Sequence, residues 1–179
     1  MKFKTRDIVI SAMLIVLYVI GAKLSIQVFT VPFSLQTLFV LLGALIFGPR
    51  IGAVSVAVYL LMGLIGLPVF AQGSGPSYFM GPSAGFLIGF FFMAIVVGIM
   101  SDVFTNKNII KNNFVKYTII ALVGVLVQYA VAIIYFCILL NKSPMTGIEL
   151  LFVPFFPVDC VKVIIAVFIT IKMRKVLRK

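Results

Sequence analysis

Two charged residues stand three positions apart inside an apolar stretch near the carboxyl end: Asp159 and Lys162, in the string FPVDCVKV. On a helix this spacing puts both side chains on one face, with Cβ atoms ~5–6 Å apart. A charge inside a membrane costs from ~2.5 kcal/mol upward unless it is paired, hydrated or bound to a ligand. We interpret the pair as the floor of a polar pocket. A mutually neutralising structural pair is the alternative.

A second polar candidate is Gln36. Pro32 favours an extended approach of the chain, Ser34 is a good helix cap, and Gln36 then falls in the first helical turn. Its amide is expected either to contact a ligand or to face water at the membrane interface. Gln128, midway along another apolar run, is expected to hydrogen-bond a neighbouring helix.

The segment GLPVFAQGSGPSYFMGPSAGF contains a long loop, Pro68–Ser83. It is rich in Gly, Ser and Pro, yet it carries the large side chains Phe70, Tyr78 and Phe79. Long loops in compact proteins are often lids or binding loops. We therefore predict that this loop roofs the pocket and that its aromatic residues cover a ligand.

Several kinds of chemistry are excluded by what is missing. There is no His, hence no HExxH metal motif, and there is no Gly-x-x-x-x-Gly-Lys-Ser/Thr loop to cradle nucleotide phosphates. Only one carboxylate lies deep in an apolar run, whereas an intramembrane aspartyl protease needs two. The sequence predicts no catalytic residue, no metal and no cofactor, so it does not describe an enzyme.

The amino-acid composition predicts which kind of secondary structure positions these residues. Of 179 residues, 63% are hydrophobic and 11% charged, with a mean hydropathy of +1.27. One soluble core cannot hide so much apolar surface, so the chain is expected to be an integral membrane protein. Continuous rather than alternating apolar runs indicate helices instead of a barrel. We expect one all-α domain over 1–179 with six spans at 7–26, 34–47, 51–67, 84–101, 117–140 and 153–173.

The net charge of +11 is a topology signal rather than a nucleic-acid-binding surface. With six spans, twelve basic residues fall on one side and only Lys142 lies in a loop on the other. The twelve are Lys2, Lys4, Arg6, Arg50, Lys107, Lys111, Lys116, Lys172, Arg174, Lys175, Arg178 and Lys179. Both termini are therefore expected in the cytoplasm, with the basic tail 172–179 acting as a lipid-facing anchor.

Three strings together resemble a known family. They are VPFSLQTLFVLLGALIFGPRIGAVSV, then GLIGLPVFAQGSGPSYFMGPSAGFLIGF, then FFPVDCVKVIIAV, in that order over most of the chain. They resemble BioY, the biotin-specific S components of energy-coupling-factor (ECF) vitamin transporters. The GLPVF…GxG…GPSxG string with the later DxxK carries the likeness.

The resemblance implies a six-helix subunit in a prokaryotic plasma membrane that captures biotin from outside. Its implied partners are a transmembrane coupling subunit and two cytoplasmic ABC-type ATPases. Asp159 and Lys162 match the DxxK whose side chains contact biotin. Ser74, between Gly73 and Gly75, stands where many members carry Asn. A stand-alone, proton-coupled transporter of a small carboxylate-bearing vitamin, using Asp159, is the alternative, and a membrane enzyme or assembly factor fits less well.

Overall fold

The computed structural model describes residues 4–27, 31–107 and 110–177, most of them in long helices. Apolar chain forms helices in a membrane because every backbone N–H and C=O must find a partner within the protein. The elements are α1 (Thr5–Lys23), β1 (Ser25–Gln27), β2 (Pro32–Ser34), α2 (Gln36–Leu64), η1 (Pro76–Met80), α3 (Ala84–Asn106), α4 (Asn113–Leu140), α5 (Pro144–Gly147), η2 (Ile148–Phe152) and α6 (Phe156–Leu177).

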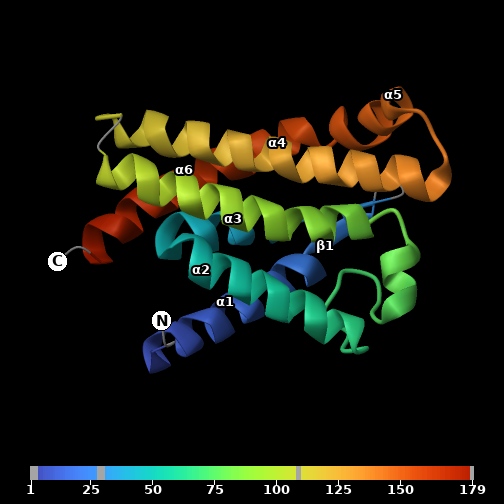
Figure 1. The fold of residues 1–179 in the computed structure, drawn as a ribbon, viewed down its shortest axis with the longest axis horizontal. Helices are drawn as coiled ribbons and strands as arrows, with labels where there is room; N and C mark the ends of the chain where they lie inside the picture. Colours follow the sequence, from blue (N-terminus) through green and yellow to red (C-terminus); the bar gives the residue numbers. More distant parts are fainter. Residues whose placement is uncertain (1–3, 28–30, 108–109, 178–179) are drawn as a thin grey trace.

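Helix α2 reverses direction in its middle. Gly48 has φ +81°, a conformation that side chains disfavour, and Pro49 follows it without an N–H to continue the helix. Gln36 Nε2 donates to the Tyr59 hydroxyl at 2.7 Å. In a straight helix these residues would lie ~34 Å apart at 1.5 Å per residue. The two halves of α2 therefore run antiparallel, as Figure 1 shows in the cyan and teal ribbon.

This reversal confirms the expected number of spans. Within the described residues, α1, α2, α3 and α4 are each long and apolar enough to cross a membrane. Residues 156–176 make a fifth candidate with the 144–152 segment, the two parts being bent by 55°. Counting the two antiparallel halves of α2 separately gives six main helical segments in the described chain, the number expected from the sequence.

Several element boundaries differ from the expected ones. The first span stops at Lys23 rather than residue 26, because Ser25–Gln27 pairs as an antiparallel strand with Pro32–Ser34. The segment 141–152, expected to be a loop, instead contains α5 and the π-helical turn η2. Helix α4 starts earlier than expected, since the Asn112 side chain caps it by accepting from two backbone N–H groups.

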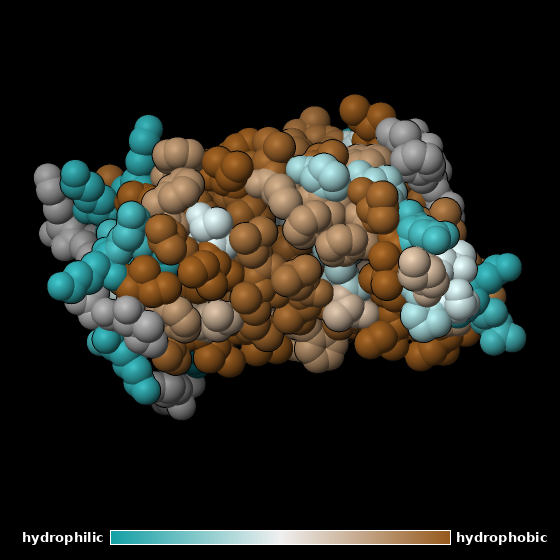
Figure 2. Space-filling view, turned by 90° about the horizontal axis from the view of Figure 1, so that it is seen from above, coloured by the Kyte–Doolittle hydropathy of each residue, from teal (hydrophilic) through white to brown (hydrophobic). Residues whose placement is uncertain are grey.

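Both ends of the chain approach the same end of the bundle. Helix α1 begins and α6 ends there, while β1, η1 and α5 lie at the other end (Figure 1). On the face shown in Figure 2, apolar side chains form a belt across the middle, and hydrophilic side chains gather at the two ends. This arrangement is the one that six spans require. Which end faces the cytoplasm remains a prediction from the basic residues.

Glycines bring α3 and α4 into close contact. A Cβ added to Gly85 would lie 2.9 Å from Ala132 Cα, and one added to Gly89 would lie 2.8 Å from the Gln128 carbonyl oxygen. Small residues allow such backbone approach and are typical of helix pairs in membranes. The close contact carries Gln128 into the interior, where its side chain is 1% exposed.

The basic tail is not entirely a lipid-facing anchor, so that expectation is wrong for Arg174. Its Nε donates to the Leu45 carbonyl oxygen at 2.9 Å and its NH2 to Ser101 Oγ at 2.8 Å. Its NH1 donates to Thr105 Oγ1 at 3.1 Å and to the Tyr117 hydroxyl at 3.2 Å. The guanidinium thus joins α6 to α2, α3 and α4. Its planar set of donors suits such a junction.

Candidate functional site

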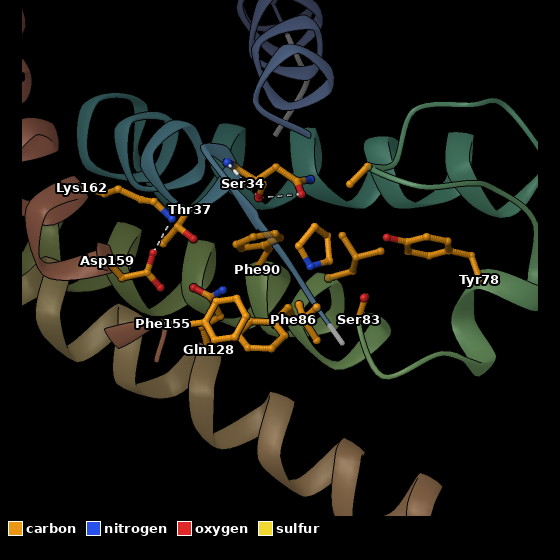
Figure 3. Close-up of a pocket in the computed structure, with 15 residues that line it drawn as sticks. Ser34, Thr37, Tyr78, Ser83, Phe86, Phe90, Gln128, Phe155, Asp159 and Lys162 are labelled. Atoms are coloured by element: carbon orange, nitrogen blue, oxygen red, sulfur yellow. Dashed lines mark hydrogen bonds and ion pairs between the residues drawn. The ribbon is translucent and has the colours of Figure 1, made fainter. Parts of the chain in front are cut away.

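A cavity lies among the ends of the helices and the 68–83 loop, on the side away from the termini. Its walls come from β2, both ends of the loop, and helices α2, α3, α4 and α6. They are Val31, Pro32, Ser34, Gln36, Thr37, Ala71, Tyr78, Ser83, Phe86, Leu87, Phe90, Gln128, Phe155, Asp159 and Lys162. Figure 3 shows the Asp159–Lys162 pair at one end of this set, with Tyr78 and Ser83 at the other.

The charged end is a hydrogen-bonded group of three side chains. Lys162 Nζ donates to Asp159 Oδ1 at 2.7 Å, and the Tyr129 hydroxyl donates to Asp159 Oδ2 at 2.6 Å. Asp159 is 3% exposed and Lys162 7%. Asp159 also lies in the first turn of α6, where the helix dipole stabilises a negative charge. The prediction that Asp159 and Lys162 share one face of a helix is confirmed. The Lys162 ammonium still has N–H groups that could donate to a ligand.

Neutral polar groups border the same space. Ser34 Oγ donates to Gln36 Oε1 at 3.2 Å, while Gln36 Nε2 is bound to Tyr59. The Oε1 of Gln128 is buried without a hydrogen-bond partner among the described residues. An unsatisfied buried acceptor costs ~1–3 kcal/mol. This oxygen does not make the expected hydrogen bond to a neighbouring helix and is instead free to accept one from a ligand in this cavity.

Aromatic walls separate the two polar ends. Phe86, Phe90 and Phe155 lie between them in Figure 3, and Phe86 and Phe155 have ring centroids 5.9 Å apart. At the far end, burial raises the pKa of Tyr78 above its usual value of 10.0. Its phenol stays neutral at pH 7 and can donate a hydrogen bond. The cavity thus suits an elongated ligand with polar groups at both ends and an apolar middle.

The 68–83 loop is held over this region through its backbone. Lys23 Nζ donates to the Phe70 carbonyl oxygen at 2.8 Å, and the Tyr59 hydroxyl to the Val69 carbonyl oxygen at 3.1 Å. The Phe70 ring fills a notch at Gly63, where a Cβ would lie 1.9 Å from the ring. Lys23, expected only as a charge inside a span, is therefore a support for the loop.

The predicted site residues divide into two sets. Gln36, Tyr78, Asp159 and Lys162 line the cavity, whereas Gly73, Ser74, Gly75, Phe70 and Phe79 do not. Phe70 is fully buried against the ring of Tyr78 at 4.9 Å and that of Phe79 at 5.6 Å. In this structure the two phenylalanines support Tyr78 rather than form the cavity wall.

Several residues of the site had no distinct signal in the sequence. They are Thr37, Ser83, Phe86, Phe90, Phe155 and Tyr129. Most of them belong to apolar segments or to the first turns of helices. In such segments the sequence does not distinguish a residue that lines a pocket from one that packs in the core. Gln128 alone had a signal, as a lone amide within the apolar run of α4.

The cavity is small, at about 40 Å³. Pockets for drug-sized ligands typically measure ~300–1,000 Å³, whereas this space admits only a few water molecules. A ligand of vitamin size can therefore enter only if part of the wall moves. The wall formed by the 68–83 loop is outside the helices, which makes it the most easily displaced part.

A six-span bundle with a charged pocket under a loop defines a membrane-embedded ligand-binding protein. The family model for the BioY family matches residues 1–179. A probable biotin transporter BioY from Lysinibacillus sphaericus is 41% identical over 137 residues, covering 76% of this chain and 67% of that protein. The biotin transporter BioY of Thermotoga maritima is 32% identical over 174 residues, covering 95% and 96%.

A solved structure has the same fold. The crystal structure at 2.1 Å of the S-component for biotin from an ECF-type ABC transporter superposes with a TM-score of 0.84. It covers 99% of this chain and 96% of its own, at 28% identity. The chain belongs to the BioY family. It is thus a multi-pass transport protein of the cell membrane, not an enzyme.

Proposed function

We propose that this chain binds biotin and serves as the S subunit of an ECF-type transporter. The observation that carries the proposal is the buried Asp159–Lys162 pair, placed at one end of an aromatic-walled cavity in a fold shared with a biotin S-component. Direct titration of the purified chain with biotin and a panel of other vitamins tests it. Saturable binding of biotin, but not of the other vitamins, supports the proposal. Absence of biotin binding contradicts it.

The two ends of the cavity suggest an orientation for the ligand. The ureido ring of biotin carries a carbonyl acceptor beside N–H donors, which complements an ammonium donor beside a carboxylate acceptor. We infer that Asp159 accepts a ureido N–H and Lys162 donates to the ureido oxygen, each bond being charge-assisted. The fused rings would pack on Phe86, Phe90 and Phe155. The carboxylate would then lie toward Gln36 and the loop, within reach of the Tyr78 hydroxyl.

Two ligand analogues test this orientation. Biotin amide lacks the carboxylate charge and is expected to bind with near-normal affinity in calorimetric titration. Iminobiotin, whose guanidinium-type group would place positive charge beside Lys162, is expected to bind far more weakly at a pH where it is protonated. The reverse ranking would put the carboxylate on Lys162 and refute the assignment.

The loop is expected to become more ordered when the ligand binds. The cavity must first open to admit biotin, and closing the 68–83 loop over it costs conformational entropy. Hydrogen exchange of the loop amides should therefore slow at saturating biotin. Amides in the first turn of α4, at the opposite end of the bundle, serve as the internal control. Equal exchange rates in the loop with and without biotin would refute its role as a lid.

We further propose that transport depends on a coupling subunit and two ATPases, because this chain contains no phosphate-binding loop. The purified chain should bind biotin without hydrolysing ATP. Vesicles containing the chain should take up biotin against a gradient only after the partner subunits and ATP are added. Uptake by the chain alone, driven by a proton gradient, would favour the stand-alone alternative in which Asp159 couples to protons.

A further inference from the structure

Arg174 brings a positive charge into the end of the bundle where the chain termini lie. All four of its hydrogen bonds go to neutral oxygens, those of Leu45, Ser101, Thr105 and Tyr117. Such acceptors satisfy N–H groups but do not neutralise the charge, and an arginine stays protonated in proteins. Within the described residues, no carboxylate lies within 4.0 Å of the guanidinium.

A second uncompensated cation lies beside it. Lys116 is 4% exposed, and its amine has neither an acceptor nor an acidic partner within the described ranges. Its Nζ lies 4.9 Å from the centroid of the Tyr117 ring, and Arg174 Cζ lies 5.3 Å from the same centroid. One aromatic ring therefore touches two cations. No carboxylate lies beside either cation in the described ranges, so an anion at this place would be favoured.

An open cavity of about 470 Å³ adjoins Arg174 and Tyr117. Its walls are Asn113, Tyr117, Ile171, Arg174 and Lys175, from the start of α4 and the last turns of α6. Nearby acidic residues are engaged elsewhere. Asp7 accepts from the backbone N–H of Lys4 on α1, and the Asp102 carboxylate lies beside Gly48. The cavity is thus electropositive and large enough for a polar headgroup.

The position of the cavity indicates which anion it takes. It lies where α4 begins and α6 ends, at the polar end of the bundle that holds the chain termini. One turn below Ile171 along α6 is Phe168, which is 55% exposed and packs on Phe114 with ring centroids 5.4 Å apart. An apolar surface leading away from a cationic cavity suits an acyl chain attached to a phosphate. A soluble anion would make no use of that surface.

We propose that this cavity binds the phosphate of an anionic phospholipid, with Arg174 and Lys175 in its wall providing the charge and Lys116, outside the wall beside Tyr117, adding to the positive potential. The site is independent of biotin binding at the opposite end of the bundle. The bound lipid would brace α4 against α6 where Arg174 already joins the helices. Arg174 itself is unsuitable as the principal test variant, because its loss would also remove four structural hydrogen bonds.

The test is native mass spectrometry of the full chain in detergent with dioctanoyl phosphatidylglycerol. One lipid is expected to bind saturably and more tightly than dioctanoyl phosphatidylcholine, and inorganic phosphate is not expected to displace it. Lys175→Gln should weaken phosphatidylglycerol binding about fivefold, as expected for one lysine near a charged membrane surface, and Lys116→Gln, which lies outside the wall, should weaken it less. Lys107→Gln, an exposed lysine at the same end outside the cavity, is the matched control and should cause no measurable loss.

Biotin titration of each variant separates failure to fold from loss of the lipid. If Lys116→Gln no longer binds biotin, Lys175→Gln decides, since Lys175 is exposed and its side chain makes no hydrogen bond or ion pair within the described residues. Equal binding of the two lipids would overturn the proposal, as would equal losses in Lys107→Gln and Lys175→Gln. Displacement of the lipid by inorganic phosphate would also overturn it. Binding that appears only with a coupling subunit present would assign the cavity to a protein partner instead.

Discussion

Replacing either Asp159 or Lys162 with alanine is expected to remove most of the affinity for biotin. Each substitution leaves the other charge buried without its partner, and truncating one member of a buried, hydrogen-bonded charge pair at a binding site costs ~2–5 kcal/mol. The loss corresponds to about one and a half to three and a half powers of ten in Kd, since ~1.4 kcal/mol is tenfold. Isothermal titration of the purified variants measures it directly.

Matched variants distinguish ligand recognition from mere charge neutralisation. Val161→Ala changes a 57% exposed residue on the same helix and should bind biotin normally. Tyr129→Phe removes one hydrogen bond to Asp159 and should cost less, ~1.5–3 kcal/mol. The double variant Asp159→Ala/Lys162→Ala should fold better than either single variant, yet still fail to bind. Normal biotin affinity in a folded double variant would make the pair purely structural.

Gly98→Ala is expected to destabilise the protein by about 1–3 kcal/mol or more. A Cβ at this position would lie 2.3 Å from the backbone nitrogen and Cα of Pro49 and 2.8 Å from the Gly48 carbonyl carbon. These are backbone atoms at the reversal of α2, so they cannot rotate away as a side chain would. The substitution should separate α3 from the turn that sets the two halves of α2 antiparallel.

Thermal unfolding in detergent, with and without biotin, measures this effect. Ile99→Ala is the matched control, because the neighbouring side chain is 49% exposed on the lipid-facing side of α3. The control should unfold close to the unchanged protein, while Gly98→Ala should unfold at a clearly lower temperature. An unchanged unfolding temperature for Gly98→Ala would mean that α3 and the α2 turn are not in close contact.

The main features of the fold were predictable because they depend on local pattern. Long apolar runs identify spans, since a bilayer leaves the backbone no other way to satisfy its hydrogen bonds. The spacing of Asp159 and Lys162 was enough to place them on one face of α6, because a helix turns every ~3.6 residues. The strand at Ser25–Gln27 was not predictable, since it exists only by pairing with Pro32–Ser34 further along the chain.

The tertiary structure alone decided which faces meet. Tyr129 holds Asp159 from 30 positions away, Lys23 reaches Phe70 across 47, and Arg174 reaches Leu45 across 129. Hydrophobic periodicity normally indicates which face of a helix is buried. Here nearly every helix face is apolar, so periodicity cannot predict which helices pack against one another. Packing of glycines and a few buried polar groups makes that choice. The sequence by itself therefore determined a six-span membrane protein with one charged pair, and only the fold made that pair one end of a cavity.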